Sequence, residues 1–360
     1  MYYQIVEKAY DNAAYNAGSK ARTDTAEVLR RLGFADAPMT PHDPGRAGAG
    51  RVGKLMGHLR AAADWKKALS HMGEGDVAVI QLPLINHTVY IERAFAAARR
   101  RGLKVIGLVH DLEELRCQLE SGSGAEMSRY AREGAAQRRI SDVLIVHTEQ
   151  MRDYLTDELG ADADSLVLLG IFDYLLDADA PVSEDDGSVA IAGNLKREKA
   201  GYIYRLPEKP DFSLYGAGLD ENGTGANVHY RGRFSPDVPG MLTGSYGLVW
   251  DGPSAETCEG VYGEYLRYNA PHKTSLYLAC GMPVIIWRQA ALAALITGRG
   301  AGIAVDSLGE ITAAIGEIDP ERYAVMRRAA AELGRELRCG LRLTGAVNEA
   351  LDRLGETYNN

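Results

Sequence analysis

Short apolar runs of the kind that form buried parallel strands alternate with stretches of helical periodicity along almost the whole chain. In the first half, the runs predict strands at residues 3–6, 77–82, 104–110, 143–147 and 165–169. The intervening periodicity predicts helices at residues 23–32, 55–71, 90–100, 125–139 and 148–159. Such alternation is typical of α/β proteins, in which right-handed crossovers build an open parallel sheet.

The pattern pauses once and then restarts. Residues 173–187 are acidic, contain a proline and show no periodicity, which is typical of a linker between domains. After them, strands are predicted at 189–192, 212–215, 228–231, 247–250, 284–287 and 303–305, and helices at 195–204, 271–279, 290–297, 308–318 and 321–338. We therefore predict two Rossmann-like lobes with parallel sheets that face a central cleft. Their boundaries are 1–172 for the N-terminal lobe, 173–187 for the linker, 188–340 for the C-terminal lobe and 341–360 for a terminal helix expected to pack back on the N-terminal lobe.

Composition excludes several classes of protein. The net charge of −9 over 360 residues argues against a nucleic-acid binder, so an anionic ligand would need a local positive site. No apolar run reaches the roughly 18 residues that cross a bilayer, and the N-terminus lacks the layout of a signal peptide. The four cysteines lie far apart without metal-binding spacing, so each is expected to be a buried thiol in a reducing cytoplasm.

The strongest candidate for a binding site is the entrance of the helix predicted at residues 271–279. Pro271 is placed as the first helical residue, and His272, Lys273, Thr274, Ser275 and Leu276 follow it. The first turn of a helix offers unpaired N–H groups and a partial positive charge, which suit a phosphate. His272 and Lys273 add cationic or hydrogen-bonding side chains at the same point. An ordinary helix entrance with accidental polar residues is the alternative.

Four strands of the second lobe end in glycine turns on the edge where this helix begins. The first carries Gly193 and Asn194, and Lys196 and Arg197 follow at the start of a helix. The others end at residues 215–218, 230–233 and 247–252, with Tyr230 at the third turn. Ligands of such sheets bind outside the carboxyl ends of the strands. A solvated Lys/Arg pair is the alternative for Lys196 and Arg197.

In the first lobe, two segments are candidates for contact with a ligand. Asn16, Gly18 and Ser19 are expected in a loop between the first strand and the first helix, where a βα turn approaches a phosphate or a sugar. Asp111 follows a buried strand and is a candidate general base. The structural alternative for Asp111 is a helix N-cap that forms a capping box with Glu114.

Other motifs carry less weight. Residues 48–53 match a GxGxxG pattern, but no strand precedes them, so we expect a mobile loop beside the cleft. The DxD-like segments 162–164 and 177–179 lie in acidic connections, where a metal site is not expected. Glu256 and Glu264 are spaced like the glutamate pair of retaining two-lobed glycosyltransferases, but they are out of register with the Gly-x-Pro-Val turn and are placed in a loop at 254–267.

The motifs at 192–195, 215–216, 230–237, 247–250 and 273–285, together with 109–111 and 16–19, resemble bacterial glucosyltransferase 3-like enzymes, a family that includes proteins labelled β-1,6-galactofuranosyltransferase. The resemblance implies a GT-B fold and a UDP-sugar substrate. It implies that Arg197, Tyr230 and Pro271 to Leu276 hold UDP, which the Gly18–Ser19 loop approaches from the other lobe. It also implies a homodimer or homotetramer that acts in cell-surface glycan synthesis, on exopolysaccharide or in protein glycosylation.

These observations predict a cytoplasmic hexosyltransferase, at most peripherally in contact with the inner face of a membrane. It would move glucose or galactofuranose from a UDP-sugar to a carbohydrate or glycoprotein acceptor, with no cofactor and no bound metal. The out-of-register glutamate pair favours inversion with Asp111 as base. Two alternatives stay open, a non-catalytic two-lobed sensor of a nucleotide or sugar and a sugar-nucleotide epimerase.

Overall fold

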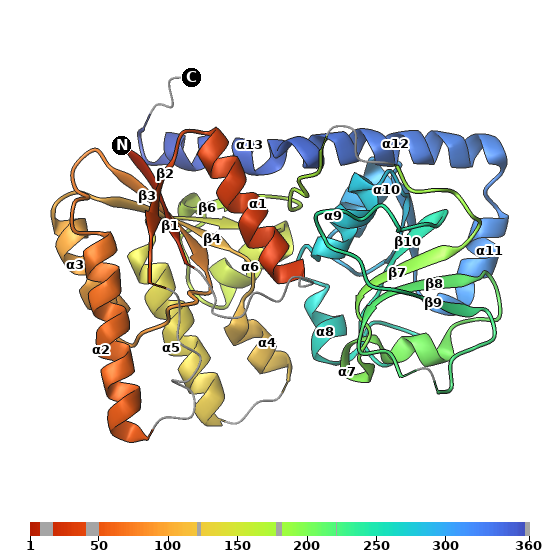
Figure 1. The fold of residues 1–360 in the computed structure, drawn as a ribbon, viewed down its shortest axis with the longest axis horizontal. Coiled ribbons are helices and arrows are strands. Elements are labelled where there is room, and N and C mark those ends of the chain that lie inside the picture. Colours follow the sequence, from red (N-terminus) through yellow and green to blue (C-terminus); the bar gives the residue numbers. More distant parts are fainter. Residues whose placement is uncertain (8–16, 41–49, 121–123, 178–181, 221, 357–360) are drawn as a thin grey trace.

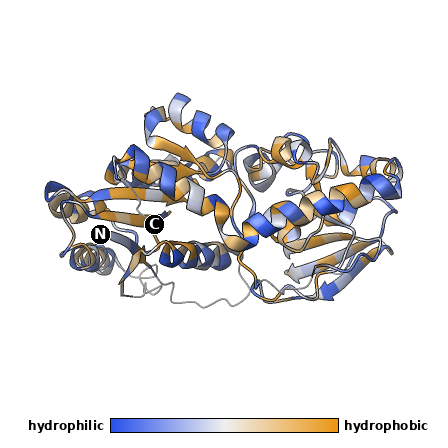
Figure 2. Ribbon diagram, turned by 90° about the horizontal axis from the view of Figure 1, so that it is seen from above, coloured by the Kyte–Doolittle hydropathy of each residue, from blue (hydrophilic) through white to orange (hydrophobic). Residues whose placement is uncertain are grey.

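A computed structural model describes residues 1–7, 17–40, 50–120, 124–177, 182–220 and 222–356. Its strands form two six-stranded parallel sheets, one in each half of the chain, and helices cover them (Figure 1). Strands of both sheets are largely apolar, whereas the helices alternate between polar and apolar residues (Figure 2). The two-lobed α/β architecture predicted from the sequence is thereby confirmed.

The first sheet has the order β2-β1-β3-β4-β5-β6. Its strands are β1 (Tyr2–Val6), β2 (Ala35–Pro38), β3 (Val77–Leu82), β4 (Lys104–Val109), β5 (Val143–Val146) and β6 (Leu166–Leu168). The sequence prediction missed β2, three of whose four residues are exposed. Its position at the edge of the sheet tolerates Pro38 and requires no apolar run.

Six α-helices and a 3-10 turn accompany the described part of this sheet. They are α1 (Ala17–Arg31), α2 (Arg51–Ala68), α3 (Ile91–Arg100), α4 (Glu113–Leu119), α5 (Gly124–Ile140), α6 (Glu149–Asp157) and η2 (Ala163–Ser165). The prediction of a mobile loop at 48–53 is wrong for residues 51–53, because Arg51 begins α2 and Gly50 is the N-cap of that helix. Residues 48 and 49 of that segment lie outside the described residues.

The second sheet has the order β12-β11-β10-β7-β8-β9. All six of its strands were predicted from the sequence. They are β7 (Val189–Asn194), β8 (Phe212–Ala217), β9 (Val228–Gly232), β10 (Tyr246–Val249), β11 (Val284–Trp287) and β12 (Gly302–Val305). The central strands β10 and β11 are buried at every residue. Such strands retain a continuous apolar signal because helices cover both faces of a parallel sheet.

The helices of the second half are α7 (Arg197–Ala200), α8 (Gly260–Tyr265), α9 (His272–Ala279), α10 (Ala293–Gly298), α11 (Ile311–Gly316), α12 (Pro320–Cys339) and α13 (Leu341–Arg353), with 3-10 turns η3 (Gly201–Arg205) and η4 (Leu308–Glu310). The loop expected at 254–267 is therefore wrong in part, because Glu264 lies in α8. Its carboxylate pairs with Arg267 at 2.7 Å.

The last two helices run across both lobes (Figure 1). α12 packs on α9, and α13 packs on α1, β5 and β6 of the first lobe. Gly340 separates them with a φ of 80°, a left-handed conformation that glycine adopts without strain. The carboxylate of Asp173 accepts hydrogen bonds from the backbone N–H groups of Arg342 and Leu343, so the beginning of the acidic linker is bound to the start of α13.

The cysteine expectation holds for three of the four residues. Cys117, Cys258 and Cys280 are buried, whereas Cys339 is exposed at the last position of α12. All four are free thiols. Nowhere in the described ranges does a helix combine the length and the apolar character needed to span a membrane.

One side chain fixes α9 beneath the second sheet. The ring of Tyr277 fills the space beside Gly247 of β10, where any added Cβ would overlap it. The Tyr277 hydroxyl accepts a hydrogen bond from the backbone N–H of Ala192 in β7 at 2.8 Å. On the other side of α9, a Cβ at Gly334 of α12 would overlap the Leu278 carbonyl oxygen. α9 is thus held closely from two sides.

We predict that Tyr277→Phe lowers the free energy of unfolding by about 1–3 kcal/mol, because the buried N–H of Ala192 loses its partner. Denaturant unfolding measures the loss. Tyr3→Phe is the matched control, since the Tyr3 hydroxyl contacts only the Met1 sulfur at 3.5 Å in an exposed position. An equal loss in both variants would contradict the anchoring role of Tyr277.

Candidate active site

The carboxyl ends of three second-lobe strands meet at predicted site residues. Gly193 ends β7 with a φ of 132°, and Gly216 in β8 has a φ of 148°. A Cβ on Gly216 would overlap the carbonyl oxygen of Gly193, so only glycine allows this approach. The Tyr230 hydroxyl of β9 donates to the Gly216 carbonyl at 2.8 Å. The structure thus brings Gly193 and Tyr230 together through Gly216.

α9 begins one residue later than predicted. Pro271 is the N-cap in an extended conformation, and its carbonyl oxygen accepts a hydrogen bond from the Thr274 N–H. The N–H of Thr274, in the turn expected to offer unpaired N–H groups, is therefore already paired. The N–H groups of His272 and Lys273, the first two helical residues, lie where a helix supplies no acceptor.

The next three predicted residues lie in the protein interior. Thr274 and Ser275 have no exposed surface, and Leu276 is 7% exposed. The Ser275 hydroxyl donates to the carbonyl of Phe172 at 2.7 Å, which joins α9 to the chain that follows β6. Ser275 and Leu276 therefore pack α9 between the lobes in this conformation.

Lys273 belongs to a small cluster of charges. Its ammonium group donates to the Asp251 carboxylate at 2.7 Å and to the Trp250 carbonyl at 2.9 Å. Lys199, on α7, lies 3.9 Å from the other oxygen of the same carboxylate. Burial lowers the pKa of Lys273, and the negative charge of Asp251 opposes that shift. Two ammonium groups share one carboxylate, which leaves a net positive charge at the entrance of α9.

Three buried polar atoms around this entrance have no hydrogen-bond partner among the described residues. They are Oδ1 of Asn269, Nδ1 of His272 and Oγ1 of Thr274. An unpaired buried polar atom costs free energy, so such atoms are uncommon and indicate a missing partner. All three lie within six residues of the chain, so unmet hydrogen-bonding capacity is concentrated at this entrance.

The structure assigns His272 a hydrogen-bonding role and not a cationic one. Its Nε2 contacts the Asp173 carbonyl at 3.3 Å, which requires the proton on Nε2 and leaves Nδ1 as an acceptor. Burial, assisted by the charge of Lys20, lowers the pKa of His272 to about 4. The ring is therefore neutral near pH 7, and Nδ1 suits a hydroxyl donor better than a phosphate.

The remaining second-lobe candidates lie near α7. The Asn194 side chain accepts a hydrogen bond from the N–H of Lys196, the exposed N-cap of α7. Arg197 stacks on the ring of Tyr204 at 3.7 Å and pairs with Asp220 at 3.0 Å. In this conformation the guanidinium of Arg197 is thus held at the 220–222 segment and not at the Lys273 cluster.

A loop was expected at Asn16 to Ser19. The described part of this segment instead begins a helix, so the expectation is wrong there. Asn16 lies outside the described residues, whereas Gly18 and Ser19 belong to the first turn of α1. Ser19 is exposed, and its carbonyl oxygen accepts a hydrogen bond from the Thr23 hydroxyl. Lys20, the next residue, reaches Asp237 of the second lobe at 3.3 Å.

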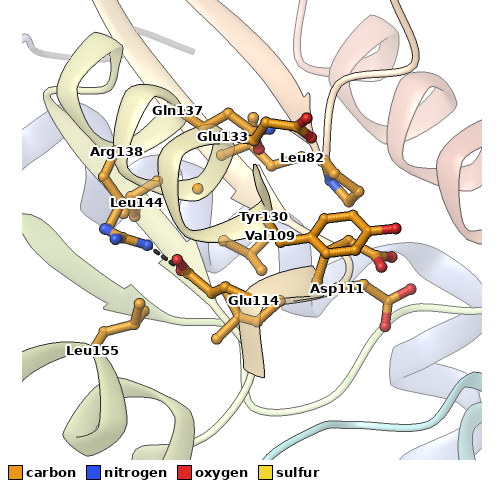
Figure 3. Close-up of a pocket in the computed structure, with 14 residues that line it drawn as sticks. Leu82, Val109, Asp111, Glu114, Tyr130, Glu133, Gln137, Arg138, Leu144 and Leu155 are labelled. Atoms are coloured by element: carbon orange, nitrogen blue, oxygen red, sulfur yellow. Dashed lines mark hydrogen bonds and ion pairs between the residues drawn. The ribbon is translucent and has the colours of Figure 1, made fainter. Parts of the chain in front are cut away.

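Asp111 lies at the carboxyl end of β4 and lines a pocket between β4 and α5 (Figure 3). The pocket also contains the carboxylates of Glu113 and Glu133 and the ring of Tyr130. Asp111 is partly exposed, and Arg116 lies 3.7 Å from one of its oxygens. Carboxylates and an aromatic ring that converge on a pocket suit the hydroxyl groups and the apolar face of a sugar.

The capping-box alternative for Asp111 is wrong. Leu112 is the N-cap of α4, and no side chain caps that helix. Glu114 instead pairs with Arg138 of α5, as the dashed line in Figure 3 shows. The backbone N–H of Leu112 donates to the Tyr265 hydroxyl of α8 at 2.8 Å, so the residue after Asp111 is bound to the second lobe.

Three histidines surround Phe172 where the lobes meet. The ring of His110 is stacked on Phe172 at 5.3 Å, and His147 and His272 approach it at 4.7 and 6.1 Å. His147 contacts the Val109 carbonyl through Nε2 and accepts the Ala270 N–H at Nδ1. The Thr148 hydroxyl donates to the Tyr268 carbonyl beside it. The segment before α9 is thus bound to the end of β5.

Several of these residues were missed in the sequence. Lys199, Asp251, His147 and Phe172 carry no motif, and only the fold brings them to the site. The strand end that holds Asp251 was identified, so the charge at its last position was the one available signal for the Lys273 partner. Within the described ranges no group of three or more histidine, cysteine, aspartate and glutamate side chains is arranged to hold a metal ion.

Comparisons with known proteins identify the family of this chain. Residues 3–170 match the model of the glucosyltransferase 3-like N-terminal domain, and residues 189–350 match that of the C-terminal domain. The β-1,6-galactofuranosyltransferase WbbI of Escherichia coli K12 is 34% identical over 351 residues, which cover 94% of this chain and 96% of WbbI.

Two solved structures share the fold. Sucrose-phosphate synthase from Thermosynechococcus elongatus has a TM-score of 0.64 at 15% identity and covers 97% of this chain and 99% of its own. Anabaena HepE in complex with UDP has a TM-score of 0.58 at 13% identity. The match covers 98% of this chain and 100% of the HepE chain. The fold and site define a two-lobed glycosyltransferase of the GT-B class. The chain belongs to the glucosyltransferase 3-like family.

The neutral histidines predict how stability depends on pH. Burial lowers the pKa of His147 to about 4, whereas an unfolded histidine titrates near 6.5. Below pH 6.5 the unfolded chain binds a proton that the folded His147 refuses, so stability falls as the pH decreases toward 4. His147→Asn should remove one such group, worth up to about 3 kcal/mol across this range.

Denaturant unfolding between pH 7 and 5, where His110 and His272 still contribute, measures the change. The informative quantity is the slope of stability against pH, because the variant is also expected to be less stable at every pH. A slope identical to that of the unmodified chain would show that His147 is protonated in the folded state.

Proposed function

We propose that this glycosyltransferase transfers a hexose, glucose or galactofuranose, from a UDP-sugar to a carbohydrate or glycoprotein acceptor in cell-surface glycan synthesis. The observation that carries the proposal is the net positive Lys273–Asp251–Lys199 cluster beside three unpartnered polar atoms at the entrance of α9. The galactofuranosyltransferase relative and the UDP complex of HepE support a UDP-sugar donor.

In the proposed reaction the diphosphate lies at the entrance of α9. The N–H groups of His272 and Lys273 and the two ammonium groups stabilise the charge that develops on the departing UDP. These groups would neutralise that charge without a bound metal ion. Gly193 and Gly216 allow the nucleotide to approach the backbone closely at the strand ends, and Tyr230 borders them.

The acceptor sugar is placed in the Asp111 pocket. Asp111 removes the proton of the acceptor hydroxyl, and the oxygen forms a bond to the anomeric carbon. The bond from that carbon to the β-phosphate oxygen breaks, and UDP leaves with the electron pair. A single displacement of this kind inverts the anomeric configuration. The pairing of Glu264 with Arg267 gives no support to a retaining glutamate pair.

Lys273→Ala should weaken UDP binding by about 10- to 100-fold, the range expected for one charged hydrogen bond. Titration calorimetry with UDP measures the affinity. Lys209→Ala is the matched control, because Lys209 precedes β8 and so lies near the amino-terminal edge of the same sheet. Circular dichroism and the unfolding midpoint establish that both variants fold. Unchanged UDP affinity in folded Lys273→Ala would exclude the phosphate role.

Asp111→Asn should lower kcat by about 10²- to 10⁴-fold while UDP affinity is retained, because only the proton transfer is removed. Glu113→Gln, which changes a neighbouring carboxylate of the same pocket, should retain most of kcat. The assay follows UDP release from UDP-glucose, UDP-galactose, UDP-galactofuranose and UDP-N-acetylglucosamine with an acceptor. Comparable kcat for Asp111→Asn and the unmodified chain would exclude Asp111 as base. Interconversion of donor sugars would identify an epimerase, and binding without turnover a sensor.

A further inference from the structure

Helix α2 is apolar on two opposite faces. Gly57, Ala61 and Trp65 are buried and turn one face toward the protein, and the Trp65 indole donates to the Asn86 carbonyl. The opposite face carries Val52, Leu55, Met56 and Leu59, all between 46% and 75% exposed. A helix that only covers a sheet needs one apolar face, so the second one calls for a separate explanation.

The four exposed residues form one continuous stripe. Their spacing of three, four and seven residues places them within about 100° of the helix circumference, over the first three turns of α2. Exposed Ala63 continues the stripe, and Lys66 and Lys67 end it. Figure 1 shows α2 at the outer edge of the first lobe, where its N-terminal half projects beyond the sheet. We call this stripe the outer face of α2.

Positive charge borders the outer face. Arg51 and Arg60 flank the stripe on its two sides, whereas Lys54 lies on the opposite side of the helix near its N-terminus. All three are exposed, and the described residues supply no ion-pair partner for any of them. In sequence, α2 holds five basic residues and one acidic residue, although the whole chain carries a net charge of −9. This local reversal of sign would attract an anionic surface.

We propose that the outer face of α2 docks on an anionic lipid bilayer. A basic helix with an exposed stripe of leucine, valine and methionine lies in the plane of a membrane, with the apolar side chains inserted and the cations against anionic headgroups. A second copy of the chain is a poorer match, because a symmetric contact through this face would bring Arg51 and Arg60 against the same cations of the other copy.

The experiment is co-sedimentation of the full chain with lipid vesicles. The chain should bind vesicles that contain phosphatidylglycerol, bind those of phosphatidylcholine alone at least tenfold more weakly, and lose affinity as salt rises. The double variant Leu55→Glu with Met56→Glu should reduce the binding at least tenfold. The triple variant Arg51→Gln, Lys54→Gln and Arg60→Gln should weaken it and abolish most of the salt dependence.

The matched control is Val325→Glu on α12. Val325 is 56% exposed and has exposed Arg322 and Arg328 three residues to either side, but no apolar stripe surrounds it. This variant should bind vesicles as the unmodified chain does. All substitutions are at exposed positions, and UDP titration establishes that each variant is folded independently of the membrane result.

Absence of binding to phosphatidylglycerol vesicles at low salt would overturn the proposal, as would an equal effect of Val325→Glu. Sedimentation velocity without lipid tests whether a second copy of the chain covers the outer face of α2 instead. An oligomer that Leu55→Glu with Met56→Glu dissociates, without vesicle binding by the unmodified chain, would assign the face to a second copy. None of these outcomes bears on the assignment of the donor site, which depends on elements of the second lobe.

Discussion

The contact between Tyr277 and Gly247 determines where the entrance of α9 lies. A ring that occupies the place of a Cβ on β10, with its hydroxyl bonded to the backbone of β7, fixes the helix against two neighbouring strands. α12 holds the opposite side of α9 at the close approach that Gly334 permits. The first residues of α9 therefore emerge beside the end of β10, where Asp251 meets Lys273. A helix free to slide by one turn, about 5.4 Å, would separate this pair.

The charges at this entrance explain why the site can bind an anion without a large positive field. Burying Lys273 alone would be costly, and Asp251 offsets part of that cost. Lys199 on α7 then supplies the excess positive charge. His272 adds an acceptor and no charge, because burial favours its neutral form. Under the proposed function, the cations at the entrance face the diphosphate and the lone pair of His272 Nδ1 accepts a hydroxyl of the donor.

The sequence predicted the elements that tertiary burial makes apolar and missed those that single contacts stabilise. All six strands of the second sheet were predicted, whereas β2, with three exposed residues, was not. α4 and α8 were missed because they are short and depend on each other: Arg116 lies over the rings of Tyr262 and Tyr265. For the site, the position of α9 followed from local sequence. Its partners Asp251 and Lys199 did not, since their proximity depends on packing between separate elements.

Two sets of contacts join the lobes, and they differ in what lobe opening would cost. α12 and α13 form a continuous connection with the bound Asp173, and separating them would expose apolar surface. The contacts across the cleft combine polar pairs, such as Lys20 with Asp237 and His147 with the Ala270 N–H, with the packing of the His272 ring against Phe172. Water can replace the polar pairs when the lobes separate. Opening about the helical connection would expose the entrance of α9, the proposed donor site. Because the Asp111 pocket and the outer face of α2 belong to the same lobe, a lobe held at a bilayer leaves the donor-binding lobe free to make this movement.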